Sequence, residues 1–164
     1  MNWKNIWAFL LGLSYLYLQL LVMPALELFG VIPNILIPWL VYLVWTRELK
    51  PVLISGFIIG LMYDTTMPES FGARAFIFVL LALATDQFRR PFESESVIAR
   101  ILTLVVANLI YHLAELLVLG VVYGFGQGLL GLAGIAFVYD LAFSFIVFWS
   151  LQFLSRLRVV SVHD

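Results

Sequence analysis

Residues Val97 to Leu119 read VIARILTLVVANLIYHLAELLVL. A helix needs about 20 mostly apolar residues to cross the hydrocarbon core of a bilayer, so this stretch has spanning length. The rest of the chain is similar in character, because 63% of its 164 residues are hydrophobic and only 12% are charged. Such a chain has too little polar surface to cover itself in water. We therefore expect one all-α domain over residues 1–164, built as a polytopic bundle of transmembrane helices.

Five further apolar runs complete a prediction of about six transmembrane helices, and three of them are short for a crossing. The runs cover residues 6–23, 31–45, 52–63, 73–88 and 130–154. No small-x-small cleavage site follows the first run, so we expect an uncleaved helix and not a signal peptide. Pro38 lies inside the second run, where loss of a backbone hydrogen bond predicts a kink. The sequence leaves open whether the third run spans the membrane fully.

The distribution of basic residues predicts an orientation. Lys and Arg favour cytoplasmic loops. Six crossings with the N-terminus inside place eight of the nine basic residues in the cytoplasm, and only Arg74 outside. The eight are Lys4, Arg47, Lys50, Arg89, Arg90, Arg100, Arg156 and Arg158. The prediction is therefore a multi-pass protein with both termini in the cytoplasm. A net charge of −1 gives no indication of a nucleic-acid partner, and the absence of cysteine excludes disulfides and thiolate metal sites.

Four polar residues lie within the two longest runs. Asn108, His112 and Glu115 are spaced four and three apart, so they share one helical face, and Asp140 falls at a comparable depth in the antiparallel sixth run. Ionisable groups at membrane depth usually face the bundle interior or a cavity. We expect an interhelical cluster of these four residues. Its role is either a hydrogen-bonded lock on helix register, which we favour, or a proton relay or polar ligand pocket.

The segment from Gly56 to Gly72 carries the second distinctive pattern. Gly56 and Gly60 form a G-x-x-x-G step that favours tight helix packing, and Asp64 follows one turn later on the same face. A carboxylate at the C-terminus of a helix opposes the helix dipole. Asp64 therefore needs a partner, either Arg74 or nearby loop amides. We favour a structural anchor, with contact to a partner or ligand as the alternative.

A glycine-rich, uncharged stretch separates the last two runs. Its second half has glycines at positions 128, 131 and 134. We expect this stripe of small residues to let helices approach closely, with a flexible outer loop as the alternative.

The pattern of Gly60, Leu61, Asp64, Pro68 and Gly72 resembles the MreD family of the bacterial rod-shape system, as do the length and the number of predicted helices. The resemblance implies a non-enzymatic adaptor in the bacterial inner membrane. It implies direct binding to MreC, and work with MreB, RodA and a penicillin-binding transpeptidase in peptidoglycan synthesis by the elongasome. Membrane lipids are further expected contacts.

The resemblance also suggests where partners bind. The candidate contact residues lie in the outer segments, in the loop around Glu27 and in the motif itself. Those of the motif are Gly56, Gly60, Asp64, Pro68, Phe71 and Gly72.

Two other classes of function are weaker alternatives. The MreD family is similar in fold to the substrate-binding subunits of energy-coupling-factor vitamin transporters, which makes a small-molecule transport subunit the main rival. An enzyme is disfavoured, because the chain lacks H-E-x-x-H and G-x-S-x-G motifs. His112 and Glu115 alone do not make a metal site, so we expect no catalytic residue, metal or cofactor.

Overall fold

The computed structural model describes residues 3–92 and 96–160, with side chains for 6–92 and 96–153. In these ranges the chain is all-helical, as predicted, and has no named strand. The helices are α1 Trp3–Leu21, η1 Met23–Leu26, α2 Leu36–Thr46, α3 Leu49–Asp64, η2 Pro68–Ser70, α4 Ala73–Arg89, α5 Val97–Tyr123 and α6 Gln127–Val160.

The helices are unequal in length. In the described ranges, α5 and α6 are the two helices that are long and apolar enough to cross a membrane. At 1.5 Å per residue, the 11 residues of α2 extend only about 16 Å. The second predicted run begins at residue 31, but α2 begins at Leu36, because residues 32–34 are irregular. Pro38 is the third residue of α2, where its missing N–H costs no helical hydrogen bond, so the expectation of a lost bond and a kink was wrong.

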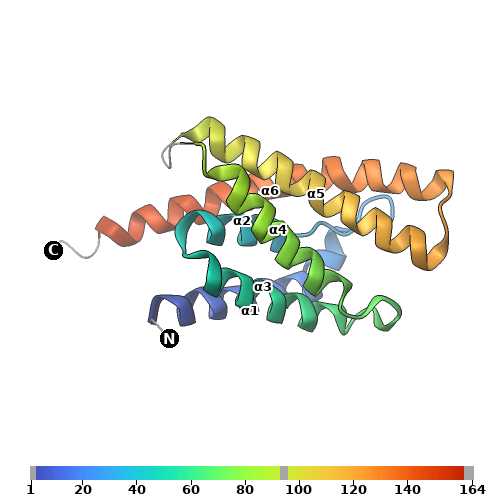
Figure 1. Cartoon of the computed structure of the whole chain (residues 1–164), viewed down its shortest axis with the longest axis horizontal. Coiled ribbons are helices and arrows are strands. Elements are labelled where there is room, and N and C mark those ends of the chain that lie inside the picture. The colour runs from blue at the N-terminus through green and yellow to red at the C-terminus, as the bar shows by residue number, and fades with distance from the viewer. Residues whose placement is uncertain (1–2, 93–95, 161–164) are drawn as a thin grey trace.

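The shortest α-helix lies at the centre of the bundle. Eight of the 11 residues of α2 are buried, and α2 contacts each of the other five α-helices. Figure 1 shows α5 and α6 running antiparallel along one side, with α1 and α3 along the other and α4 crossing between them. Both ends of the chain emerge at the same end of the molecule. We call this end the terminal end, and the opposite one, which carries the 22–35 and 65–72 segments, the loop end.

Two glycines make room for the core. Trp39 of α2 is fully buried, and its ring occupies the space that a Cβ on Gly12 of α1 would need. On the other side, a Cβ on Gly60 would lie 2.6 Å from the Cα of Ala75. The backbones of α3 and α4 are therefore in contact at Gly60. This explains the G-x-x-x-G step, whose other member, Gly56, faces Leu40.

The glycine stripe on α6 makes no comparable contact. In the part of the chain that the structure describes, nothing lies within 4 Å of a Cβ built on Gly128, Gly131 or Gly134. The stripe belongs to the first two turns of α6 and is exposed. The expectation that it packs against another helix of this chain is therefore wrong, and so is the alternative of a flexible loop, because these residues are helical.

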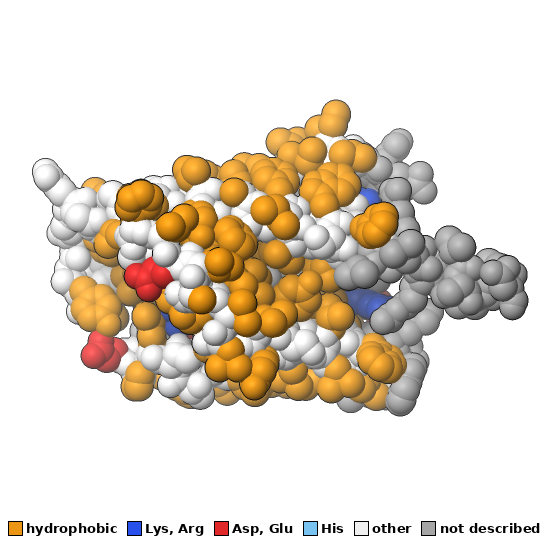
Figure 2. Space-filling model, turned by 180° about the vertical axis from the view of Figure 1, so that it is seen from behind, with side chains coloured by type: hydrophobic (Ala, Val, Ile, Leu, Met, Phe, Trp, Pro, Cys, Tyr) orange, Lys and Arg blue, Asp and Glu red, His pale blue; other side chains and the backbone are white. Residues whose placement is uncertain are grey.

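Charged side chains are scarce on the middle of the molecule. Figure 2 shows one face on which hydrophobic side chains cover the central region, with acidic groups toward the loop end. Many large hydrophobic side chains of the helices are exposed, including Phe76, Leu117 and Val138. A broad apolar surface of this kind suits contact with lipid or protein.

The close approach at Gly60 gives a first testable prediction. Gly60→Ala should destabilise the protein by about 1–3 kcal/mol, because the backbone of α4 must move to admit the methyl group. Gly131→Ala is the matched control, since its methyl group meets nothing and alanine favours a helix. Equilibrium unfolding of both variants in detergent micelles would test this, and equal stability would contradict the packing role of Gly60.

Candidate functional site

Asp64 forms the start of α4. It is fully buried at the C-terminus of α3, and its carboxylate accepts hydrogen bonds from the backbone amides of Arg74 (3.1 Å) and Ala75 (3.0 Å). These amides lie in the first turn of α4, where no intrahelical acceptor exists. The residue before α4 is Gly72, which has no side chain and a φ of +90°. Asp64 therefore acts as a helix cap supplied by the preceding helix, which resolves its unfavourable position on α3.

The rest of the motif shapes the connection between these helices. Pro68 begins η2, a short turn in which Pro suits the first position. Gly72 allows the left-handed conformation that turns the chain into α4. Phe71 points outward and is 58% exposed. Helix packing, capping and the turn account for Gly56, Gly60, Asp64 and Gly72. Phe71, in contrast, has a large exposed side chain that is free to contact a partner.

Two side chains hold the irregular segment before α2. Gln19, buried in α1, donates to the Pro33 carbonyl (3.0 Å) and accepts from the Ile35 amide (2.9 Å). Asp140 of α6 accepts from the backbone amide of Asn34 (2.9 Å). Asn34 in turn accepts from the Leu36 amide. Gln19 was not predicted as a structural residue, although a glutamine in a long apolar run indicates an interior polar contact.

The structure brings three of the four expected polar residues together. His112 Nε2 lies 3.1 Å from an Asp140 carboxylate oxygen, and His112 Nδ1 lies 3.9 Å from Glu115. Glu115 also accepts a hydrogen bond from the Tyr111 hydroxyl. Asn108 makes a separate pair with Ser144 of α6, at 3.1 and 3.2 Å. That pair ties α5 to α6, and Ser144 was not singled out from the sequence.

Arg74 reaches this cluster from the start of α4. Its guanidinium lies 3.8 Å from Glu115 and stacks over the Tyr63 ring at 4.3 Å. From the sequence, Arg74 was placed on the outer side as a candidate partner of Asp64, and its contact with Glu115 was not predicted. A cation held over an aromatic face is stabilised by the ring quadrupole.

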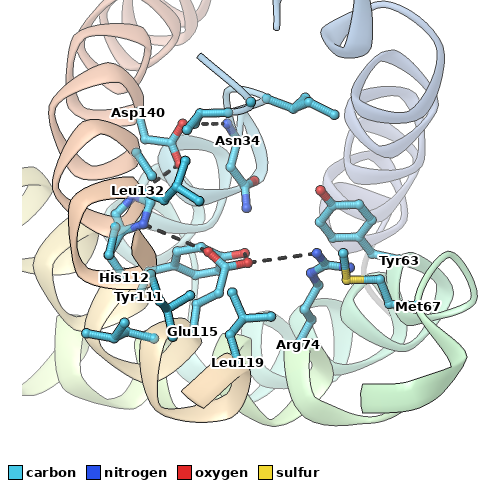
Figure 3. A pocket seen from close by; sticks show the side chains of 17 residues that line it. Asn34, Tyr63, Met67, Arg74, Tyr111, His112, Glu115, Leu119, Leu132 and Asp140 are labelled. Atoms are coloured by element: carbon cyan, nitrogen blue, oxygen red, sulfur yellow. Dashed lines mark hydrogen bonds and ion pairs between the residues drawn. The ribbon is translucent and has the colours of Figure 1, made fainter. Parts of the chain in front are cut away.

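These residues form the floor of a cavity of about 270 Å³. Figure 3 shows Asn34, Tyr63, Arg74 and Glu115 pointing toward one shared space, with His112 and Asp140 beside it. The remaining lining is mostly apolar and comes from the 30–32 segment, Met67, α5 and α6. These apolar residues are Val31, Ile32, Met67, Leu116, Leu119, Leu129, Leu132, Ala133 and Ala136. The cavity therefore combines a charged floor with an apolar rim at the loop end.

The chemistry available in the cavity is recognition of polar groups. Among the described residues, no group of three or more His, Asp or Glu side chains is arranged to hold a metal ion. Asp140 lies against His112 and accepts from the backbone amide of Asn34, whereas Glu115 accepts one hydrogen bond, from Tyr111, and has His112 and Arg74 at 3.8–3.9 Å. This arrangement suits both the expected lock on helix register and binding of a small polar ligand.

A second ionic cluster lies at the terminal end. The Asp86 carboxylate accepts from Nε and Nη2 of both Arg89 and Arg90, at 2.8–3.1 Å. Arg89 donates both bonds to Oδ1 and Arg90 donates both to Oδ2, so each oxygen accepts two charge-assisted hydrogen bonds, which are stronger than neutral ones. Asp86 was missed by the sequence analysis, although its spacing to Arg89 and Arg90 is that of helical ion pairs.

An all-helical bundle with an apolar surface and buried polar side chains, two of its helices of spanning length, is the architecture of a helical membrane protein. Residues 3–159, nearly the whole chain, match the family model described as rod shape-determining protein MreD. The chain belongs to this family, which consists of membrane proteins with a role in rod-shape determination. No curated protein and no solved structure matches the chain. The family is a shape-determining one that is not known for enzymatic activity, and the transporter alternative gains no support.

The cap on α4 gives a second prediction. Asp64→Ala should lower the free energy of unfolding by about 2 kcal/mol, because one buried and one partly buried backbone amide lose their acceptors. Asp64→Asn retains one acceptor oxygen and should cost clearly less. Unfolding in detergent micelles, followed by helical circular dichroism, measures both. An Asp64→Ala variant as stable as the parent would contradict the capping role.

Proposed function

We propose that this protein is a non-catalytic subunit of the bacterial rod-shape machinery, embedded in the inner membrane. The observation that carries the proposal is the family match over residues 3–159. In this role the chain binds MreC directly and works with MreB, RodA and a penicillin-binding transpeptidase in side-wall peptidoglycan synthesis. It acts as a scaffold, which requires a rigid bundle and exposed contact surfaces.

The proposed topology has six crossings with both termini in the cytoplasm. Its support is the position of basic residues along the helices. Arg47, Lys50, Arg89, Arg90 and Arg100 lie at or near helix ends on the terminal end of the molecule. The backbones of Lys4, Arg156 and Arg158 lie in the outer ends of α1 and α6, and their side chains lie outside the described part. Arg74 begins α4 at the loop end. A cytoplasmic terminal end satisfies the preference of Lys and Arg for that side.

The proposed contact surface for MreC is the loop end. Phe71 is 58% exposed in the segment before α4, and Phe29 is 82% exposed in the turn beyond Glu27. Phe29 has a φ of +55° because it lies in a tight turn closed by two backbone hydrogen bonds between Leu28 and Val31, and the turn holds its side chain outward. Aromatic side chains, Phe included, are enriched at the cores of protein interfaces relative to the rest of the surface.

Cysteine labelling tests the topology, and the chain has no native cysteine to remove. Glu27→Cys and Glu48→Cys are a matched pair, because both glutamates are exposed and lie at opposite ends of the molecule. A membrane-impermeant maleimide should label the Glu27 variant in intact spheroplasts. The Glu48 variant should be labelled only after the membrane is permeabilised. Labelling of Glu48→Cys in intact spheroplasts would contradict the topology.

Co-purification tests the function. Full-length protein and MreC, expressed together and solubilised in mild detergent, should purify as a complex, and depletion of this protein should round rod-shaped cells. Phe71→Ala should weaken the complex about ten-fold, the effect of losing one strong aromatic contact. Phe153→Ala is the control, because Phe153 is similarly exposed but lies near the terminal end of α6. No association with MreC, together with normal cell shape on depletion, would refute the proposal.

A further inference from the structure

Three hydrogen-bond donors face the cavity from one side. The guanidinium of Arg74 lies at the cavity wall, held by Tyr63. Asn34 is 4% exposed, and its side-chain oxygen accepts from the Leu36 backbone amide. Its amide nitrogen therefore points into the cavity (Figure 3) and donates to none of the described residues. Tyr63 accepts from Gln19, so its own hydroxyl proton remains to be donated. A guanidinium with two neutral donors is a suitable set for a phosphate.

One acceptor faces the same cavity from the other side. Glu115 is 25% exposed, more than any other charged group on the floor. One of its oxygens accepts from Tyr111, but the other has only His112 Nδ1 nearby, at 3.9 Å. Arg74, at 3.8 Å, is also too far for a good hydrogen bond. Glu115 therefore has unused capacity to accept a hydrogen bond from a cationic N–H group.

Asp140 is in a different condition. One of its oxygens accepts from the backbone amide of Asn34, and the other faces His112. The two carboxylates of the floor are thus distinguished by their environment. Each Asp140 oxygen has a nitrogen within 3.1 Å, whereas the second Glu115 oxygen has its nearest nitrogen, that of His112, at 3.9 Å and so has room for a ligand.

A ligand with one charge fits this floor poorly. An anion near Arg74 meets the Glu115 carboxylate, and a cation near Glu115 meets the guanidinium. A zwitterion places opposite charges against both groups. The cavity volume of about 270 Å³ is just below the usual range of about 300–1,000 Å³ for ligand pockets, which suits a headgroup-sized molecule.

The apolar residues at the rim of the cavity indicate that the zwitterion is part of a lipid and not a soluble metabolite. Leu119, Leu129, Leu132 and Ala136 line the cavity and belong to α5 and α6, the two helices of spanning length. Leu132 is 44% exposed. Apolar residues that continue from the cavity onto a lipid-facing helix can carry acyl chains, whereas a soluble metabolite gains nothing from them.

We propose that the cavity binds the zwitterionic amine-phosphate headgroup of a phospholipid such as phosphatidylethanolamine. The phosphate is held by Arg74, Asn34 and Tyr63, the primary ammonium by Glu115, and the acyl chains lie along α5 and α6. This inference requires the membrane setting but not MreC or any other protein partner, so its failure would leave the proposed scaffold function unaffected.

Native mass spectrometry of the delipidated full chain, titrated with lipids of identical acyl chains, tests the proposal. Phosphatidylethanolamine should bind at least about ten-fold more tightly than phosphatidylcholine, which has no N–H donor, and phosphatidylglycerol, which has no cation. Equal binding of the three lipids would overturn the proposal, because it indicates only nonspecific lipid. Free phosphoethanolamine binding as tightly as the lipid would overturn the lipid source.

Two variants localise the binding. Glu115→Gln should remove the preference for phosphatidylethanolamine, and Glu27→Gln should retain it, because Glu27 is exposed at the loop end but does not line the cavity. Ala133→Phe fills the cavity without changing a charged group, so it keeps the test decisive if Glu115→Gln does not fold. It should lower phosphatidylethanolamine binding at least ten-fold. Retained selective binding in a folded Glu115→Gln or Ala133→Phe variant would overturn the proposal.

Discussion

The structure depends on satisfying backbone amides where helices begin inside an apolar environment. Within a bilayer no water is present to hydrogen-bond an exposed N–H group, so each one needs a partner from the protein. The amides at the start of α4 are satisfied by Asp64. Those at the entry to α2 are satisfied by Gln19, Asp140 and Asn34. Side chains from neighbouring helices thereby allow short helices to begin in the interior.

This arrangement links the family motif to the cavity. Asp64 fixes the first turn of α4, and Arg74 belongs to that turn, so the same contact places its guanidinium opposite Glu115. Asp140 likewise holds the Asn34 amide with one oxygen and faces His112 with the other. The close approach of α3 and α4 at Gly60 brings Tyr63 beneath Arg74. Residues that serve the fold thus also position the polar floor.

The long helices have a different role. α5 and α6 are joined by the Asn108–Ser144 pair, but only a minority of their residues are buried in the molecule. They form one wall of the cavity and present apolar side chains to their surroundings. The glycine stripe on α6 adds a part of that surface where no side chain protrudes. The shorter helices, in contrast, supply the buried core around Trp39.

The sequence alone determined the helical class, the apolar surface and the family, because composition, run length and the Gly60–Gly72 motif are local properties. Spacing along one helix also placed His112 and Glu115 on one face. Only the tertiary structure decided that Arg74 reaches Glu115, that Asn108 pairs with Ser144, and that Gln19 and Asn34 hold the entry to α2. These contacts join residues up to 106 positions apart, and helical periodicity carries no information about which helices meet. The tertiary structure also decided that α2 begins at Leu36, because tertiary hydrogen bonds satisfy the irregular backbone before it.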